Sequence, residues 1–170
     1  MVGSVMPSSK FLSKKMVDHL NFKSAKLIIE LGPGTGVITE RIIEKLGTNS
    51  TLLVIELNET FYKDLKKRIT DKRVTIRKGS AADLSDFIND IEFEKADFIV
   101  SSLPLAVLPN TLRKRIVIAV NKHLDQKGTF IQFQYTLQSL KLLKKVFKNV
   151  SIKHCLFNIP PAFVYTCKKQ

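Results

Sequence analysis

Three glycines at alternate positions, preceded by a carboxylate, form the part of the sequence best suited to hold a ligand. Glu30 comes before Gly32, Gly34 and Gly36 in the stretch LIIELGPGTGVITE. Glycines let the backbone turn sharply and approach a bound molecule without a Cβ in the way. The spacing is G-x-G-x-G, and no Lys-Ser or Lys-Thr pair follows, so neither a dinucleotide fold nor a P-loop ATPase fits well.

A second carboxylate, Glu56, directly follows the apolar segment TLLVI at 51–55. It lies about 20 residues beyond the last glycine, the distance at which an acidic residue meets ribose hydroxyls in doubly wound α/β folds. A carboxylate suits that task because it can accept two hydrogen bonds from a diol. The sequence therefore predicts that Glu56 holds a ribose.

A strand, a turn and a helix must position these groups. The apolar run at 27–29 predicts a buried parallel strand, and apolar residues return at helical spacing from 37 to 46. Further strands are predicted at 51–55, 73–78, 96–101 and 129–135, with Lys127-Gly128 as the turn into the last of these. A first helix is predicted at 8–22, capped by Ser8 or Ser9, and another begins after Asn58. Two later helices are predicted from their inward apolar residues: Leu112, Ile116, Val120 and Leu124 in one, and Leu140, Leu143 and Phe147 in the other.

The end of the chain predicts an antiparallel hairpin, with strands at 150–157 and 162–167 and a turn at 158–161. Strands that alternate with helices, followed by such a pair, predict an α/β protein with a doubly wound seven-stranded sheet covered on both faces. The 170 residues predict a single domain, residues 1–170, in which 1–23 form an N-terminal helical segment.

Composition narrows the classes of function. The net charge of +13 favours a polyanionic partner, either nucleic acid or an anionic membrane surface, although it could also serve solubility alone. No apolar run approaches the roughly 20 residues of a transmembrane helix, and the start lacks a signal peptide, so we expect a cytoplasmic protein. Cys155 and Cys167 lack the spacing of metal ligands, and no other residue pattern suggests a metal. We expect both to be reduced thiols that do not lie opposite each other in the hairpin.

The glycine-rich stretch resembles the first motif of S-adenosylmethionine-dependent methyltransferases, E/D-x-G-x-G-x-G. The resemblance implies a Rossmann-like sheet of strand order 3-2-1-4-5-7-6 with the last strand antiparallel. It also implies S-adenosyl-L-methionine as cofactor, S-adenosyl-L-homocysteine as product, and glycines that wrap the methionine part and the ribose. Ser101, at the end of the fourth strand, joins the implied cofactor site. Where such enzymes often read G-D-A, this chain has Gly79, Ser80 and Ala81. Ser80, Asp83 or backbone groups could then contact the adenine.

The segment SSLPL at 101–105 should face the transferred methyl group, because the carboxyl ends of the strands line the ligand crevice. It resembles the N-P-P-Y motif of adenine methyltransferases, in which an Asn or Asp and a backbone carbonyl hold the amine and an aromatic residue stacks on the base. Ser102 stands where the Asn would be, followed by Leu103 and Pro104, and with Tyr135 these three are the candidate catalytic residues. Leu105 stands at the aromatic position and cannot stack, which counts against adenine as the acceptor.

The whole pattern resembles the bacterial phospholipid N-methyltransferases, which are distantly similar to ribosomal RNA adenine dimethyltransferases. The resemblance rests on Pro7-Ser8-Ser9, ELGPGTG, VSSLPL, QFQY and NIPPAFVY. It implies methylation of an amine such as that of phosphatidylethanolamine, at the inner membrane surface. Members usually carry a basic amphipathic helix ahead of the PSS segment, and this chain begins almost at that segment, so either the member is short or its start is trimmed.

Methyl transfer requires a neutral amine aligned with the departing sulfur. Apolar Leu103 and Leu105 would favour the neutral form. Candidate bases are Tyr135, Asp83 and His19, in that order. An aromatic face such as that of Tyr135, Phe163 or Tyr165 could hold a methylated cation. Three alternatives stay open: an RNA adenine methyltransferase, a cofactor-binding protein without turnover, and a methyltransferase for a small-molecule amine.

Overall fold

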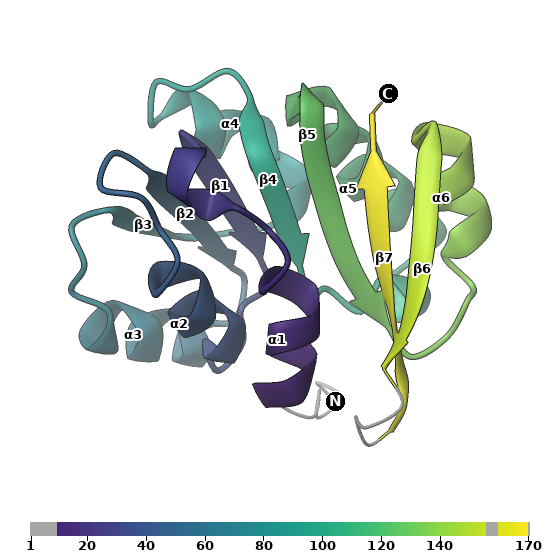
Figure 1. Cartoon of the computed structure of the whole chain (residues 1–170), viewed down its shortest axis with the longest axis horizontal. Helices are drawn as coiled ribbons and strands as arrows, with labels where there is room; N and C mark the ends of the chain where they lie inside the picture. Colours follow the sequence, from purple (N-terminus) through teal and green to yellow (C-terminus); the bar gives the residue numbers. More distant parts are fainter. Residues whose placement is uncertain (1–9, 156–159, 170) are drawn as a thin grey trace.

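Seven strands form one sheet in the order β3-β2-β1-β4-β5-β7-β6 (Figure 1). The computed structural model describes residues 10–155 and 160–169. β7 runs antiparallel to β5 and to β6, whereas β1 to β5 are mutually parallel, so the expected strand order and the antiparallel last strand are confirmed. The strands are β1 Leu27–Leu31, β2 Thr51–Glu56, β3 Val74–Lys78, β4 Ala96–Ser101, β5 Leu124–Gln134, β6 Asn149–Cys155 and β7 Ala162–Lys168.

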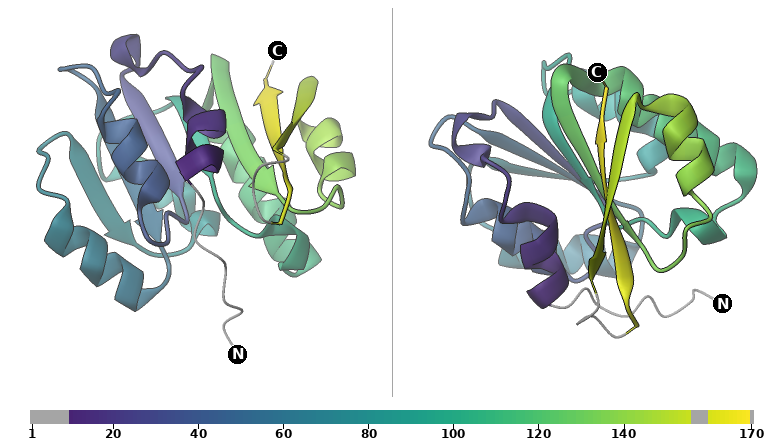
Figure 2. Two further views of the ribbon diagram at one scale, coloured as in Figure 1. Left: turned by 60° about the horizontal axis from the view of Figure 1, so that its bottom comes forward. Right: turned by 45° about the vertical axis from the view of Figure 1, so that its right-hand side comes forward.

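Helices cover both faces of the sheet (Figure 2). One hydrophobic cluster joins the sheet to α1, α2 and α3, and the other joins it to α4, α5 and α6. β1 is buried at every position, as its uninterrupted apolar run predicts for a central parallel strand. The α-helices are α1 Lys10–Val17, α2 Val37–Ile43, α3 Glu59–Arg68, α4 Leu84–Asn89, α5 Asn110–His123 and α6 Leu140–Val146; short 3₁₀ turns are η1 Phe22–Ser24, η2 Ala81–Asp83 and η3 Leu105–Val107.

The first helix is shorter than its apolar spacing predicts. α1 ends at Val17, and a separate 3₁₀ turn follows at Phe22–Ser24. Asn21 begins that turn by accepting a hydrogen bond from the backbone N–H of Lys23, a local bond that competes with continuation of the helix. The predicted cap at Ser8 or Ser9 and the Pro7-Ser8-Ser9 motif lie outside the described residues.

The predicted turn at Lys127-Gly128 is wrong, because both residues lie inside β5. α5 ends at His123, and Leu124 pairs with Ala96 as the first residue of β5. The β4–β5 register then shifts, so that Phe98 pairs with Thr129 and the residues between form an irregularity in the strand. A Cβ on Gly128 would lie 3.0 Å from the Asp97 carbonyl oxygen, which explains the glycine there.

The hairpin of β6 and β7 is confirmed, with β6 ending at Cys155; positions 158 and 159 of its predicted turn lie outside the described residues. Cys155 pairs with Ala162 and Cys167 with Val150, so the two free, buried cysteines are not opposite each other.

The carboxyl ends of β1 to β5 all reach the same edge of the sheet, at the bottom of Figure 1. The glycine loop, Glu56 and the segment after β4 all follow the carboxyl ends of their strands, so the topology alone gathers them there. Within the described part of the chain, no helix is long and apolar enough to cross a membrane.

Candidate functional site

The loop between β1 and α2 adopts a backbone that only glycines accommodate easily. Gly32, Gly34 and Gly36 have φ values of 67°, 57° and 85°. A Cβ on Gly32 would lie 2.7 Å from Cδ2 of Leu103, and a Cβ on Gly36 would lie 2.7 Å from Cδ2 of Leu65. A Cβ on Gly34 would meet no atom within 4 Å. Two of the glycines therefore permit close packing, and the third faces open space where a ligand can approach the backbone.

Glu56 links this loop to the end of β2. Its Oε2 accepts a hydrogen bond of 3.0 Å from the Gly34 N–H, and its Oε1 accepts one of 2.7 Å from the Asn58 N–H. A carboxylate offers about four lone-pair sites, so each oxygen retains acceptor capacity. These two bonds hold the Glu56 side chain, which is 6% exposed, at the edge of a cavity described below. From there its oxygens can accept further hydrogen bonds.

Glu30 carries a buried carboxyl group whose oxygens both lack a hydrogen-bond partner among the described residues. Its side chain is fully buried at the end of β1. Burial raises the pKa of Glu30 to about 8; the nearby Glu56 carboxylate adds to the rise and the Thr39 hydroxyl opposes it. An unpaired buried carboxyl beside the glycine loop could pair with a cationic group of a ligand.

A cavity of about 80 Å³ lies beside Glu56 at the ends of β2 and β3. Ser80 and Ala81 line it, and the Ser80 hydroxyl oxygen accepts a 3.1 Å bond from the Ala82 N–H. Asp83, an alternative adenine contact, lies 3.5 Å from Arg115 and does not line this cavity. The remaining walls include Gly32, Gly79, Leu108, Leu112 and Ile116; the last two were expected only on the inward face of a helix.

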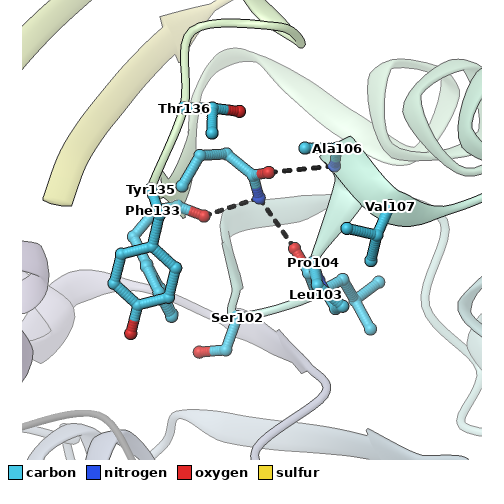
Figure 3. Close-up of a pocket in the computed structure, with 9 residues that line it drawn as sticks. Ser102, Leu103, Pro104, Ala106, Val107, Phe133, Tyr135 and Thr136 are labelled. Carbon is cyan, nitrogen blue, oxygen red and sulfur yellow. Dashed lines mark hydrogen bonds between the residues drawn. The ribbon is translucent and has the colours of Figure 1, made fainter. Parts of the chain in front are cut away.

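A second cavity, of about 110 Å³, lies at the ends of β4 and β5 (Figure 3). Three of the predicted catalytic residues, Ser102, Leu103 and Pro104, line it from one side, and Tyr135 lines it from the other. Phe133 stands beside Tyr135 with the ring centroids 5.6 Å apart and the planes at 78°. The structure thus brings all four predicted catalytic residues to one mostly apolar pocket.

The cavities share one wall, because Leu103 lines both. Ser101, predicted to bind the cofactor, lies beneath this wall with 1% exposure, and its hydroxyl oxygen accepts a 3.3 Å bond from the Leu103 N–H. The Ser102 hydroxyl is buried and has no partner among the described residues. Leu105 is fully buried in the core, so nothing at its position reaches the pocket to stack on a base.

Of the three aromatic residues proposed as alternatives for holding a cation, Tyr135 lines the acceptor pocket and the other two do not. β5 and β7 pair Gln132 with Tyr165 and Gln134 with Phe163, so both aromatic residues share the face of the glutamines. Tyr135 follows Gln134 and points to the other face, because successive strand residues alternate. Tyr165 is fully buried, and its hydroxyl donates a 3.1 Å bond to the Thr136 carbonyl. His19, the last candidate base, lines neither cavity, and burial lowers its pKa.

The sequence analysis gave no individual role to Gln132 and Gln134, which are 0% and 3% exposed. The feature that could have pointed to them is the segment FIQFQY, in which two polar residues stand at alternate positions of an otherwise apolar strand. Among the described residues, no group of three or more His, Cys, Asp or Glu side chains is placed to hold a metal ion.

These groups fit S-adenosylmethionine. Glu56 keeps free acceptor sites for a ribose diol, Glu30 is an unpaired acid for a ligand cation, and the open space at Gly34 admits a ligand against the backbone. The apolar wall of Leu108, Leu112 and Ile116 suits a flat base.

Comparisons with known proteins agree with this arrangement. A family model described as ribosomal RNA adenine dimethylase matches residues 4–152. An ornithine lipid N-methyltransferase of Singulisphaera acidiphila is 29% identical over 98% of this chain and 88% of its own length. A ribosomal RNA small subunit methyltransferase A of Aromatoleum aromaticum is also 29% identical, but over 64% of this chain and 35% of its own length.

Among solved structures, the N-methyltransferase NodS of Bradyrhizobium japonicum, in complex with S-adenosylhomocysteine, has the same fold. It superimposes with a TM-score of 0.72 at 13% identity, covering 92% of this chain and 86% of that one. From the family match over most of its length, the chain belongs to the ribosomal RNA adenine dimethylase family, and it is an S-adenosylmethionine-dependent N-methyltransferase.

Proposed function

We propose that this enzyme methylates the amine of a membrane aminolipid, such as phosphatidylethanolamine, at the inner membrane surface. The observation that carries the proposal is the length of the match to the ornithine lipid enzyme, 98% of this chain and 88% of the relative. The ribosomal relative matches over only 35% of its own length. The acceptor pocket supports the same choice, because Leu105 is buried where a base-stacking aromatic residue would be needed.

The acceptor pocket can favour the reactive form of the amine. When bound, the cofactor supplies an electrophilic methyl group on its sulfonium centre. The side chains of Leu103 and Phe133 make the pocket largely apolar, and desolvation there would lower the pKa of an ammonium group and favour the neutral amine. Tyr135 and Ser102 line the pocket from its two sides (Figure 3), and their hydroxyl oxygens are our candidates to accept a hydrogen bond from the amine, whose proton leaves to solvent.

The aromatic rings of Phe133 and Tyr135 provide a second contribution. As methyl groups are added, the acceptor nitrogen becomes a permanent cation that can no longer donate as many hydrogen bonds. Aromatic faces attract such a cation by about 0.5–2 kcal/mol. Of the alternatives that the sequence offers for this role, we propose Tyr135, with Phe133 beside it.

The proposal is tested by methyl transfer from labelled S-adenosylmethionine to vesicles of phosphatidylethanolamine and phosphatidylglycerol. We expect label in the ethanolamine lipid, and none when phosphatidylcholine replaces it, because a quaternary nitrogen has no lone pair. A parallel reaction with ornithine lipid distinguishes between amine headgroups. The absence of label from both aminolipids would refute the proposal.

A second candidate function is methylation of adenine in RNA, favoured by the family match over residues 4–152 and by the net charge of +13. It predicts tight RNA binding that weakens steeply with salt, and methylated adenine in the product. A mixed reaction that contains both RNA and aminolipid distinguishes the two functions. Label in the aminolipid and none in the RNA would exclude methylation of adenine in RNA.

A further inference from the structure

Two buried glutamines lie where β4 leaves the sheet. The last β4–β5 pair joins Ser101 to Gln132, so the backbone beyond that pair has no strand partner on this side. Gln132 and Gln134 are almost completely buried, and buried amides are costly unless hydrogen-bonded. Both amide nitrogens and the Gln134 oxygen are hydrogen-bonded, whereas Oε1 of Gln132 has no partner among the described residues.

Both glutamine amides bind the same two carbonyl oxygens. Nε2 of Gln132 donates to Leu103 O at 3.0 Å and to Phe133 O at 2.6 Å. Nε2 of Gln134 donates to the same oxygens at 2.8 and 2.7 Å. Oε1 of Gln134 also accepts a 3.0 Å bond from the Ala106 N–H, which fixes the orientation of this amide (Figure 3). The loop at 102–106 is thus fastened to β5 through side chains.

This arrangement saturates the Leu103 carbonyl. Besides the two glutamines, the Leu105 N–H donates to it at 2.8 Å. A carbonyl oxygen has two lone pairs, so three donors leave it no capacity for an incoming amine. The Leu103 side chain meanwhile forms the wall between the two cavities and packs against Gly32. The position of this wall sets how a bound acceptor lies relative to the cofactor site.

We propose that Gln132 and Gln134 are positioning residues for methyl transfer: they hold the Leu103 wall in place and exclude its carbonyl from acceptor binding. The acceptor nitrogen is then oriented by the side chains of the pocket. The inference rests on the proposed function and extends it to substrate specificity. Without a free carbonyl at Leu103, the site cannot accept a hydrogen bond there from the exocyclic amine of adenine.

The test compares Gln132→Met and Gln134→Met with a matched control, Gln126→Met, an exposed glutamine of the same strand. Methionine keeps the length of the side chain and removes the amide. We expect kcat for phosphatidylethanolamine vesicles to fall at least about tenfold in both buried variants, because small misplacements cost up to about 100-fold. The lipid KM and the Kd for S-adenosylmethionine should stay within about twofold of wild type, as should all constants of the control.

A further variant separates the two ends of the Gln134 amide. Gln134→Glu keeps an oxygen for the Ala106 N–H but places a carboxylate against the Leu103 and Phe133 carbonyls. We expect it to lose at least as much kcat as Gln134→Met. Full activity of Gln134→Glu would overturn the proposal, as would a loss of kcat that only parallels loss of cofactor binding and of thermal stability.

Amide hydrogen exchange reports on the loop independently of turnover. In Gln134→Met we expect loss of protection at Ala106, with the amide of Phe130 in β5 unchanged. Unchanged protection at Ala106 would overturn the positioning role. If wild type methylates no aminolipid, the proposed function and the positioning role fall together, whereas unchanged kcat in the variants of an active enzyme removes only the positioning role.

Discussion

Glu30 is the residue whose chemistry depends most on burial. Its pKa in the folded protein is raised to about 8, above the ordinary value of 4.5. Between these values the folded protein keeps a proton that the unfolded chain loses, so stability falls as pH rises. The stability associated with the neutral carboxyl is fully present below about pH 4.5 and is lost as pH rises through about 8. The slope can approach roughly 1.4 kcal/mol per pH unit.

We therefore expect Glu30→Gln to flatten this dependence, because an amide does not titrate. The free energy of unfolding, measured by urea denaturation at pH 5.5 and pH 8, should rise relative to wild type more at pH 8 than at pH 5.5. An equal difference at the two pH values would show that Glu30 does not retain its proton in the folded protein.

The sequence predicts the groups near the cofactor better than those near the acceptor. The glycines Gly32 and Gly34 act through their backbone conformation, and Glu56 acts through hydrogen bonds at the end of its strand. Local sequence spacing predicts both features. Phe163 and Tyr165 do not line the acceptor pocket, because the face on which they lie depends on the β5–β7 register, which local spacing does not reveal. The hydrogen bonds from Gln132 and Gln134 depend on where the Leu103 carbonyl lies, which no local sequence pattern specifies.

At the scale of elements, the alternation of strands with helices and the terminal hairpin were predictable from the residue pattern, and the resemblance supplied the strand order. Element ends were harder to predict. The irregularity in β5 arises because Gly128 approaches the Asp97 carbonyl of the neighbouring strand, a contact between segments 31 residues apart in sequence. The end of α1 depends on the Asn21 cap, whose short side chain competes with helix continuation.

One hydrogen bond ties β7 to the segment after β5. The Tyr165 hydroxyl donates to the Thr136 carbonyl at 3.1 Å from a fully buried position. We expect Tyr165→Phe to lower the free energy of unfolding by about 0.5–1.5 kcal/mol, the usual net contribution of one hydrogen bond. Tyr62→Phe is the matched control, since the Tyr62 hydroxyl has no hydrogen bond among the described residues. Equal values for the two variants in chemical denaturation would contradict this role of Tyr165.

At the scale of the whole molecule, the excess of positive charge favours an anionic surface. The net charge is +13, and exposed lysines lie on α3 and α6, on opposite faces of the sheet. Each basic residue near an anionic bilayer contributes about 1 kcal/mol, and salt screens this attraction.

We expect the enzyme to co-sediment with vesicles that contain phosphatidylglycerol at low salt, and to be released as sodium chloride rises from 0.05 to about 0.5 M. Vesicles of phosphatidylcholine alone are the neutral control. Equal binding to both kinds of vesicle, insensitive to salt, would mean that apolar contacts dominate and that the net charge serves another purpose.

The most direct test of this account is calorimetric titration of S-adenosylmethionine into wild type, Glu56→Ala and the control Glu44→Ala. Glu56 is held by Gly34 and Asn58 at the cofactor cavity, whereas Glu44 is exposed at the end of α2. Loss of the diol-binding carboxylate should weaken binding by roughly 1.5–3 kcal/mol, about tenfold or more. Wild type and the control should bind alike. Equal binding by Glu56→Ala, or no binding by wild type, would contradict the cofactor site described here.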